Sequence, residues 1–171
     1  IMTVGSAWNR HFSKPVAEVT QMNIERVGLP EWSGEDVALA NGLQRDLGQE
    51  ERGLPTQVPP LRGPINLANY SGGGSDDIGD VSWNMPTITM RYPANMPGGP
   101  GHNWANGIAM ATPIAHKGSL AGAKVQALTL LDLFLDGQTV EAAWDYFNDV
   151  QMADMTYTPF ITPDDKPAIW L

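Results

Sequence analysis

Two glycine-rich loops hold the residues whose types could do chemistry. One is GGPGHNWANG, residues 98–107, which contains His102, and the other is GGGS, residues 72–75, which three aspartates follow closely. An imidazole can bind a metal ion or transfer a proton near neutral pH. Loops positioned by a rigid scaffold often carry function, so His102 is either a functional group or an ordinary solvent-exposed histidine.

The three aspartates are Asp76, Asp77 and Asp80. Their spacing does not match the D-x-D-x-D-G loop of a calcium-binding EF-hand. Capping of the short turn that follows, by Asp77 or Asp80, is the simpler interpretation. The GGGS run lacks the lysine of a phosphate-binding loop and the glycine spacing of a dinucleotide-binding turn. It is either a tight turn that brings backbone close to a ligand or a flexible linker.

The other two histidines are His11 and His116. His11 lies at the start of an amphipathic stretch, and we expect it to face solvent. His116 begins an apolar stretch, and we expect it to make local bonds in a first helical turn. Because zinc takes three or four protein ligands, and no second histidine stands at ligand spacing from His102, the chain does not encode a complete zinc site of its own.

Composition limits the class of protein. The chain has 171 residues, 42% of them hydrophobic and 17% charged, as in a globular domain. Its net charge is −9 with ten lysines and arginines, which argues against a nucleic-acid partner. The absence of cysteine excludes disulfides, thiolate metal sites and a cysteine nucleophile. No apolar run reaches the roughly 20 residues of a membrane span, so we expect no membrane contact.

Capping signals predict two helices in the first third of the chain. The first begins after Ser13 and ends at Gly28, where a left-handed glycine is followed by a proline two residues on. The second begins with a capping pair, Ser33 and Asp36, and ends at Gly48.

The last third is also predicted to be helical. Residues 116–135 are apolar over more than half of the helix circumference, which predicts a largely buried core helix. Thr139 caps a further helix. The positions expected to be buried on the long helix are Leu120, Ala123, Ala127, Leu128, Leu131 and Phe134 or Leu135.

Between these helices, residues 53–101 contain nine glycines and eight prolines, too many for a long helix. Two short strands fit the pattern, at 65–69 and 87–92. Strands between helices predict part of an α/β layer. Two strands do not make a stable sheet, so either a partner supplies more or the chain is a piece of a larger fold.

The stretches GGGSDDIGDVSWNMPTITMRYPANMPGGPGHNW (72–104) and AHKGSLAGAKVQALTLLDLF (115–134) together resemble the C-terminal catalytic segment of a known family. This family comprises the dinuclear-metal amidohydrolases and peptidases related to aminoacylase and carboxypeptidase G. The resemblance is greatest to the p-aminobenzoyl-glutamate hydrolase branch. NIERVGLPEWSGEDVALANGLQ (23–44) resembles the helices that follow the family's inserted dimerisation domain, so the likeness runs over about residues 6–147.

The resemblance implies a fold and a domain organisation. The fold would be α/β, a partial zinc-exopeptidase-like layered sheet with flanking helices. Residues 1–171 would be the C-terminal part of one catalytic domain, without the dimerisation domain. The parts would be a helical lead-in at 6–48, a strand and loop active-site region at 53–107, closing helices at 116–150 and a tail at 151–171.

The resemblance also implies an activity. The intact enzyme would use two divalent ions, zinc or manganese, to cleave the amide bond of an N-acyl or aminobenzoyl amino acid. His102 would be a metal ligand, buttressed by Trp104. The substrate-side loop would contain Gly73, Gly74, Ser75 and Asp77.

The same likeness implies partners and a location. The remaining ligands and the general base belong to an N-terminal half that this sequence lacks, so that half would be the partner and the isolated chain would be inactive. We expect a homodimer or heteromer, a small-molecule amide substrate and a cytoplasmic location. Two other classes stay open: a non-catalytic binding or structural module that retains the fold, and an acidic calcium-binding loop domain.

Overall fold

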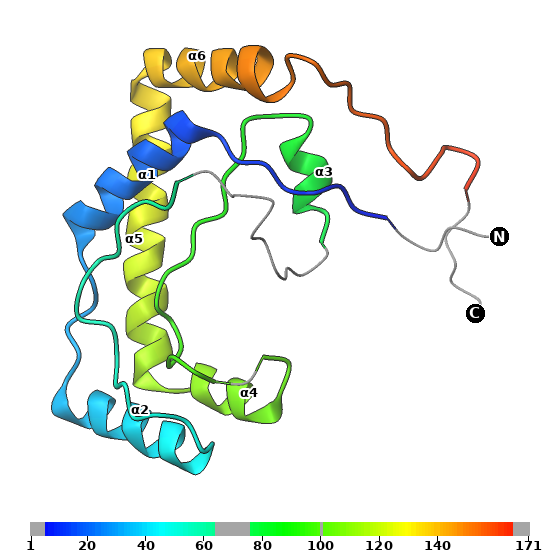
Figure 1. The fold of residues 1–171 in the computed structure, drawn as a ribbon. Helices are drawn as coiled ribbons and strands as arrows, with labels where there is room; N and C mark the ends of the chain where they lie inside the picture. The colour runs from blue at the N-terminus through cyan, green and yellow to red at the C-terminus, as the bar shows by residue number, and fades with distance from the viewer. Residues whose placement is uncertain (1–5, 64–75, 100, 166–171) are drawn as a thin grey trace. The chain divides into compact units, whose positions relative to one another are not determined.

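The computed structural model describes residues 6–63, 76–99 and 101–165, and every regular element in these ranges is helical. Figure 1 shows their course along the chain. The helices are α1 (Lys14–Val27), α2 (Gly34–Asp46), α3 (Ile78–Ser82), α4 (Trp104–Met110), α5 (Pro113–Leu135) and α6 (Gly137–Tyr146), and α6 runs on into the π-helix η2 (Phe147–Gln151).

The expected α/β layered sheet is wrong: no strand forms in the ranges that the structure describes. The proposed strand at 65–69 lies outside those ranges, and residues 87–92 form no regular secondary structure. An extended segment becomes a strand only when a neighbour pairs with its backbone groups. Here Thr87 accepts a backbone hydrogen bond from Ser13, which directly precedes helix α1, at 2.9 Å.

The chain divides into two compact units. The first comprises Ile1–Glu18, Arg62–Thr89 and Asp136–Leu171, and the second comprises Val19–Leu61 and Met90–Leu135. The second unit contains the loop with His102.

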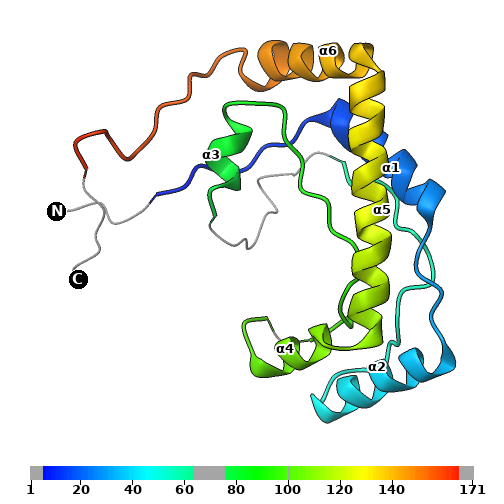
Figure 2. The same cartoon turned by 180° about the vertical axis from the view of Figure 1, so that it is seen from behind.

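The second unit has its core where α2, α4 and the N-terminal end of α5 meet (Figures 1 and 2). The predicted capping box at the start of α2 is confirmed: Ser33 Oγ accepts from the Asp36 backbone at 3.2 Å, and the Asp36 carboxylate accepts from the Ser33 backbone at 2.8 Å. Gly28 and Gly48 end α1 and α2 with φ of +71° and +68°. The buried core side chains are Ala40, Leu54, Met96, Ala109 and Ile114.

The segment of residues 92–94 runs directly against α5 at two glycines. A Cβ atom at Gly118 would overlap the carbonyl oxygen of Pro93 and lie 2.6 Å from the Cα atom of Ala94. A Cβ atom at Gly122 would lie 3.2 Å from Cβ of Tyr92. Glycines one turn apart on the helix therefore allow the backbone of the segment to approach α5 closely.

The buried face of α5 is not the one expected from the sequence. Leu120 and Phe134, placed in the core by the apolar pattern, are 61% and 85% exposed, and Leu128 is half-buried. Because apolar residues surround this helix, their spacing could not select a face. The residues that α5 buries are Ile114, Ala115, Gly118, Ala121, Gly122, Val125 and Thr129.

By length and apolar composition, α5 would also suit a membrane span, contrary to the sequence expectation. Core helices of soluble proteins have the same length and composition.

The first unit is organised around aromatic rings. Trp8 lies 4.7 Å from both Trp83 and Phe160, measured between ring centroids. His11 stacks on Trp83 at 4.7 Å, so the expectation that His11 faces solvent is wrong. Burial lowers the pKa of His11 below its ordinary value, because the charged imidazolium is poorly solvated there.

The helix after α5 begins three residues earlier than expected. Asp136, rather than Thr139, caps α6: its carboxylate accepts from the Gln138 backbone at 3.0 Å and from the Thr139 hydroxyl at 2.6 Å. The aspartate thus uses both oxygens at the helix start.

Candidate functional site

His102 is exposed in the turn that leads into α4. Its φ is +49°, the left-handed region that a residue with a Cβ seldom adopts. The next residue, Asn103, caps α4 by accepting from the Ala105 backbone at 3.0 Å. Left-handed backbone at a residue other than glycine costs about 1–3 kcal/mol and is most frequent where the surroundings over-determine a functional geometry.

The loop that carries His102 is closed at its base. The Asn95 side-chain amide donates to the side-chain oxygen of Asn106, so the two ends of the loop are joined directly. Asn95 Oδ1 also accepts from the Met96 backbone at 2.8 Å, and Met96 is buried in the core. The loop is therefore anchored on both sides of His102.

Gln44 of α2 also anchors this loop through a hydrogen bond. Its side chain is 1% exposed, and Nε2 donates to the carbonyl of Pro97 at 2.9 Å and to that of Gly53 at 3.2 Å. Its Oε1 accepts from the backbone of Arg52 at 2.9 Å and of Gly53 at 3.1 Å. One buried amide thus joins the 52–53 turn to the loop of His102. Sequence reasoning missed Gln44; the only signal was a glutamine beside the apolar stripe of a helix.

Trp104 was expected to buttress the loop, and this expectation is wrong, because its side chain is 75% exposed. Ile108, one turn further along α4, is 53% exposed. Their spacing puts both on one face of α4. An apolar, open face thus lies next to the candidate ligand.

His116 is exposed on the first turns of α5, and its backbone N–H donates to Thr112 at 3.2 Å. The next residue, Lys117, forms an ion pair with Asp36 at 2.5 Å and also donates to the Glu31 carbonyl at 3.3 Å. The hydrogen bond from Lys117 holds the pKa of the Asp36 carboxyl below its ordinary value. This pair joins α5 to the start of α2 and has a structural role.

In the ranges that the structure describes, no three His, Asp or Glu side chains gather closely enough to hold a metal ion. His102 is an accessible imidazole on an anchored loop, and in these ranges no such group of side chains includes it. A metal at His102 would need ligands from elsewhere.

The acidic loop is only partly described. Gly73, Gly74 and Ser75 lie outside the described ranges. Asp77 is exposed and makes no side-chain cap, so the capping expected of it is wrong. Asp76 does this instead: its carboxylate accepts from the Ile78 backbone at 3.2 Å and pairs with Arg10 at 3.4 Å.

Asp80 is a structural acceptor that the sequence did not reveal. Its carboxylate accepts from the Trp8 backbone at 3.3 Å and from the Tyr157 hydroxyl at 2.8 Å. Asp80 therefore joins α3 to the segments that carry Trp8 and Tyr157 in the aromatic cluster, rather than capping the turn.

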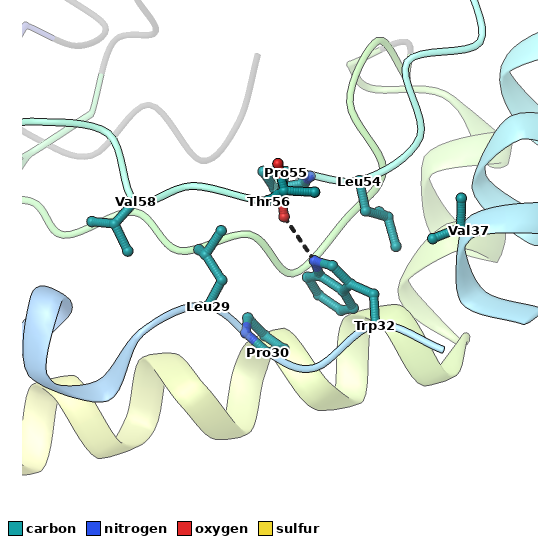
Figure 3. A pocket seen from close by; sticks show the side chains of 8 residues that line it. All are labelled: Leu29, Pro30, Trp32, Val37, Leu54, Pro55, Thr56 and Val58. Atoms are coloured by element: carbon teal, nitrogen blue, oxygen red, sulfur yellow. Dashed lines mark hydrogen bonds between the residues drawn. The ribbon is translucent and has the colours of Figure 1, made fainter. Parts of the chain in front are cut away.

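A shallow apolar pocket of about 410 Å³ lies between the α1–α2 connection and the 54–58 segment (Figure 3). Trp32 forms one wall, fixed by a hydrogen bond of 2.9 Å from its indole N–H to the Pro55 carbonyl. The lining has no titratable side chain and cannot catalyse proton transfer. It consists of Leu29, Pro30, Trp32, Val37, Leu54, Pro55, Thr56 and Val58.

Comparison with known proteins gives one informative likeness. No family model matches the chain, and no solved structure matches it. The chain is 30% identical to a subunit of p-aminobenzoyl-glutamate hydrolase from Escherichia coli K12 over an alignment of 138 residues. The alignment covers 66% of this chain but only 28% of the relative. The chain is thus similar to a hydrolase subunit and spans little more than a quarter of its length.

Proposed function

We propose that this chain is part of a metal-dependent amidohydrolase that cleaves the amide bond of an N-acyl or aminobenzoyl amino acid. The observation that carries the proposal is the 30% identity to a protein named as a subunit of p-aminobenzoyl-glutamate hydrolase, extending over 66% of the chain. That identity supports the branch to which the sequence motifs point.

His102 is the proposed metal ligand of this chain. Three features support the role: an exposed imidazole, a left-handed backbone at φ +49°, and a loop closed by the Asn95–Asn106 bond and held by buried Gln44. Together they hold the backbone of His102 in place and leave its imidazole open to a metal ion. Two zinc or manganese ions in the intact enzyme would polarise the amide carbonyl and lower the pKa of a bound water.

The substrate side is proposed to lie along the GGGS loop. Gly73, Gly74 and Ser75 would offer backbone groups, and exposed Asp77 would lie beside them. An amide with a free carboxylate needs hydrogen-bond donors, which the backbone of a glycine-rich turn can supply at close range.

In this proposal residues 1–171 are the C-terminal part of one catalytic domain. An N-terminal half of the same enzyme supplies the other ligands and the general base, and the intact protein works in the cytoplasm as a homodimer or heteromer. The word "subunit" in the relative's name fits a partner subunit. The chain by itself is inactive, because His102 is its single proposed ligand.

A hybrid protein tests the activity: the E. coli relative with its matched segment replaced by the matching residues of this chain. Release of p-aminobenzoate from p-aminobenzoyl-glutamate is measured for the hybrid protein and for the isolated chain. We expect turnover by the hybrid protein and none by the chain. A folded hybrid protein without turnover would favour the non-catalytic module, and turnover by the purified chain would refute the division of the site.

A further inference from the structure

Helix α5 has two apolar faces. One packs inside its own unit, through Val125 and the close contact at Gly118. The opposite side carries a second apolar row, with residues three and four positions apart, which places them in one stripe. We call this row the outer face of α5; it consists of Leu120, Ala123, Ala127, Leu130, Leu131 and Phe134.

The outer face is open to solvent. Phe134 is 85% exposed, Leu120 is 61% exposed, and Leu130 and Leu131 are 48% and 49% exposed. Ala123 and Ala127 between them are exposed as well. Single exposed leucines are ordinary, but a continuous apolar row along a helix marks an interaction surface. A helix that is apolar around its circumference is normally covered on both sides.

We infer that the outer face of α5 is the surface against which the remainder of the enzyme packs, meaning the polypeptide equivalent to the part of the relative outside the matched 28%. The inference rests on the proposed function, because it takes the chain as one portion of such an enzyme. The match leaves nearly three quarters of the relative to be placed, and the outer face is a long apolar row that the described part of the chain leaves exposed.

The charges on α5 favour protein over lipid as the cover. Lys124 is exposed at the edge of the outer face, and Lys117 and Asp132 lie on the same helix. Asp132 accepts from the Asn23 side chain at 2.7 Å, within its own unit. Burying such groups at the centre of a bilayer costs about 2.5–3.5 kcal/mol each. A protein partner needs only apolar side chains opposite the leucines and an acceptor opposite Lys124.

The test compares two double variants, each in the isolated chain and in the hybrid protein. Leu131→Gln with Phe134→Gln removes apolar surface from the outer face. Ser119→Gln with Gln126→Ala is the control, at exposed polar positions of the same helix. In the isolated chain both should move the unfolding temperature by no more than about 2 °C, because the side chains are exposed.

In the hybrid protein the outer-face variant should lower the unfolding temperature by at least about 5 °C and raise amide exchange in α5, while the control changes neither. Equal behaviour of the two variants there would overturn the inference. So would either of two results for the isolated chain: a stable dimer in sedimentation that the outer-face variant dissociates, or binding to phosphatidylcholine vesicles that the variant abolishes. The readouts are stability and exchange, so a hybrid protein that responds as expected but lacks turnover would contradict the proposed function alone.

The same variants are also compared by co-purification of the tagged chain with the rest of the relative, expressed as a separate polypeptide. We expect the outer-face variant to lose at least about 90% of the capture that the control retains, since a tenfold loss of affinity corresponds to about 1.4 kcal/mol. Equal capture by both variants would contradict the inference independently of whether the hybrid protein folds.

Discussion

Replacing Gln44 with leucine should loosen the loop of His102 and destabilise the second unit. The amide of Gln44 makes four hydrogen bonds, of 2.9 Å to Pro97 and Arg52 and of 3.1–3.2 Å to Gly53, at a side chain that is 1% exposed. Leucine has a similar volume but leaves two backbone N–H and two carbonyl groups without this partner. Each buried group left unsatisfied costs about 1–3 kcal/mol.

Some of these backbone groups will be re-solvated, since the turn lies near the surface, so we expect a total loss of about 2–5 kcal/mol in unfolding free energy. Gln21→Leu is the matched control. Gln21 also donates to a loop carbonyl, that of Pro59 at 3.0 Å, but at an exposed position. Its loss should cost less than about 0.5 kcal/mol.

The assay is urea unfolding followed by circular dichroism, combined with amide exchange of the peptide that contains residues 96–103. Gln44→Leu should lower the urea midpoint and speed exchange in that peptide, and Gln21→Leu should do neither. Equal unfolding free energies for the two variants, within about 0.5 kcal/mol, would refute the argument that the buried amide positions the loop.

Two further predictions concern packing and pH. Gly118→Ala should lower the unfolding free energy by about 1–3 kcal/mol or more, because the new methyl group meets the Pro93 backbone. Gly42→Ala, with open space around it in α2, should instead raise the unfolding free energy by about 0.5–1 kcal/mol. Thermal unfolding of both variants tests this difference. The lowered pKa of His11 means that the unfolded chain takes up a proton first as the pH falls below 6.5, so stability should decline there, and His11→Gln should flatten the decline in unfolding free energy measured between about pH 7 and 5.

The parts of the fold that the sequence predicted correctly are those set by local signals. These signals are the capping box of Ser33 and Asp36 and the left-handed glycines Gly28 and Gly48. Each acts within one turn of its own helix, so it can be recognised from the sequence without knowledge of the rest of the fold. The ends of α1 and α2 were therefore predicted to within a residue or two.

The predictions of a strand at 87–92 and of the buried face of α5 were wrong, because both features depend on contacts between distant parts of the chain. Residues 87–92 have strand composition, but a strand needs a neighbour, which is a property of the whole fold. Along α5 apolar residues occur at every angle, and the choice of face depends on what packs there. Gly118 and Gly122, four residues apart in an apolar helix, were the available signal for the side that backbone approaches.

In the candidate site too, the residues with local signals could be predicted from the sequence and those with distant partners could not. His102 stands out from the sequence because glycines and prolines surround it, and its left-handed backbone agrees with a loop under constraint. Gln44 and Asn106 do not stand out, because their role depends on loops that are distant in sequence. Asp80 likewise acquires its role through Trp8 and Tyr157, more than 70 positions away.

The central claim is that His102 is a metal ligand of an amidohydrolase. The measurement that tests it most directly is the bound zinc and manganese of the hybrid protein, by elemental analysis, in the unchanged form and as His102→Ala and His116→Ala. We expect His102→Ala to lose one ion per chain and most hydrolysis of p-aminobenzoyl-glutamate with its unfolding temperature unchanged, and His116→Ala to keep both ions. Full metal content in His102→Ala, with loss in His116→Ala, would contradict the assignment.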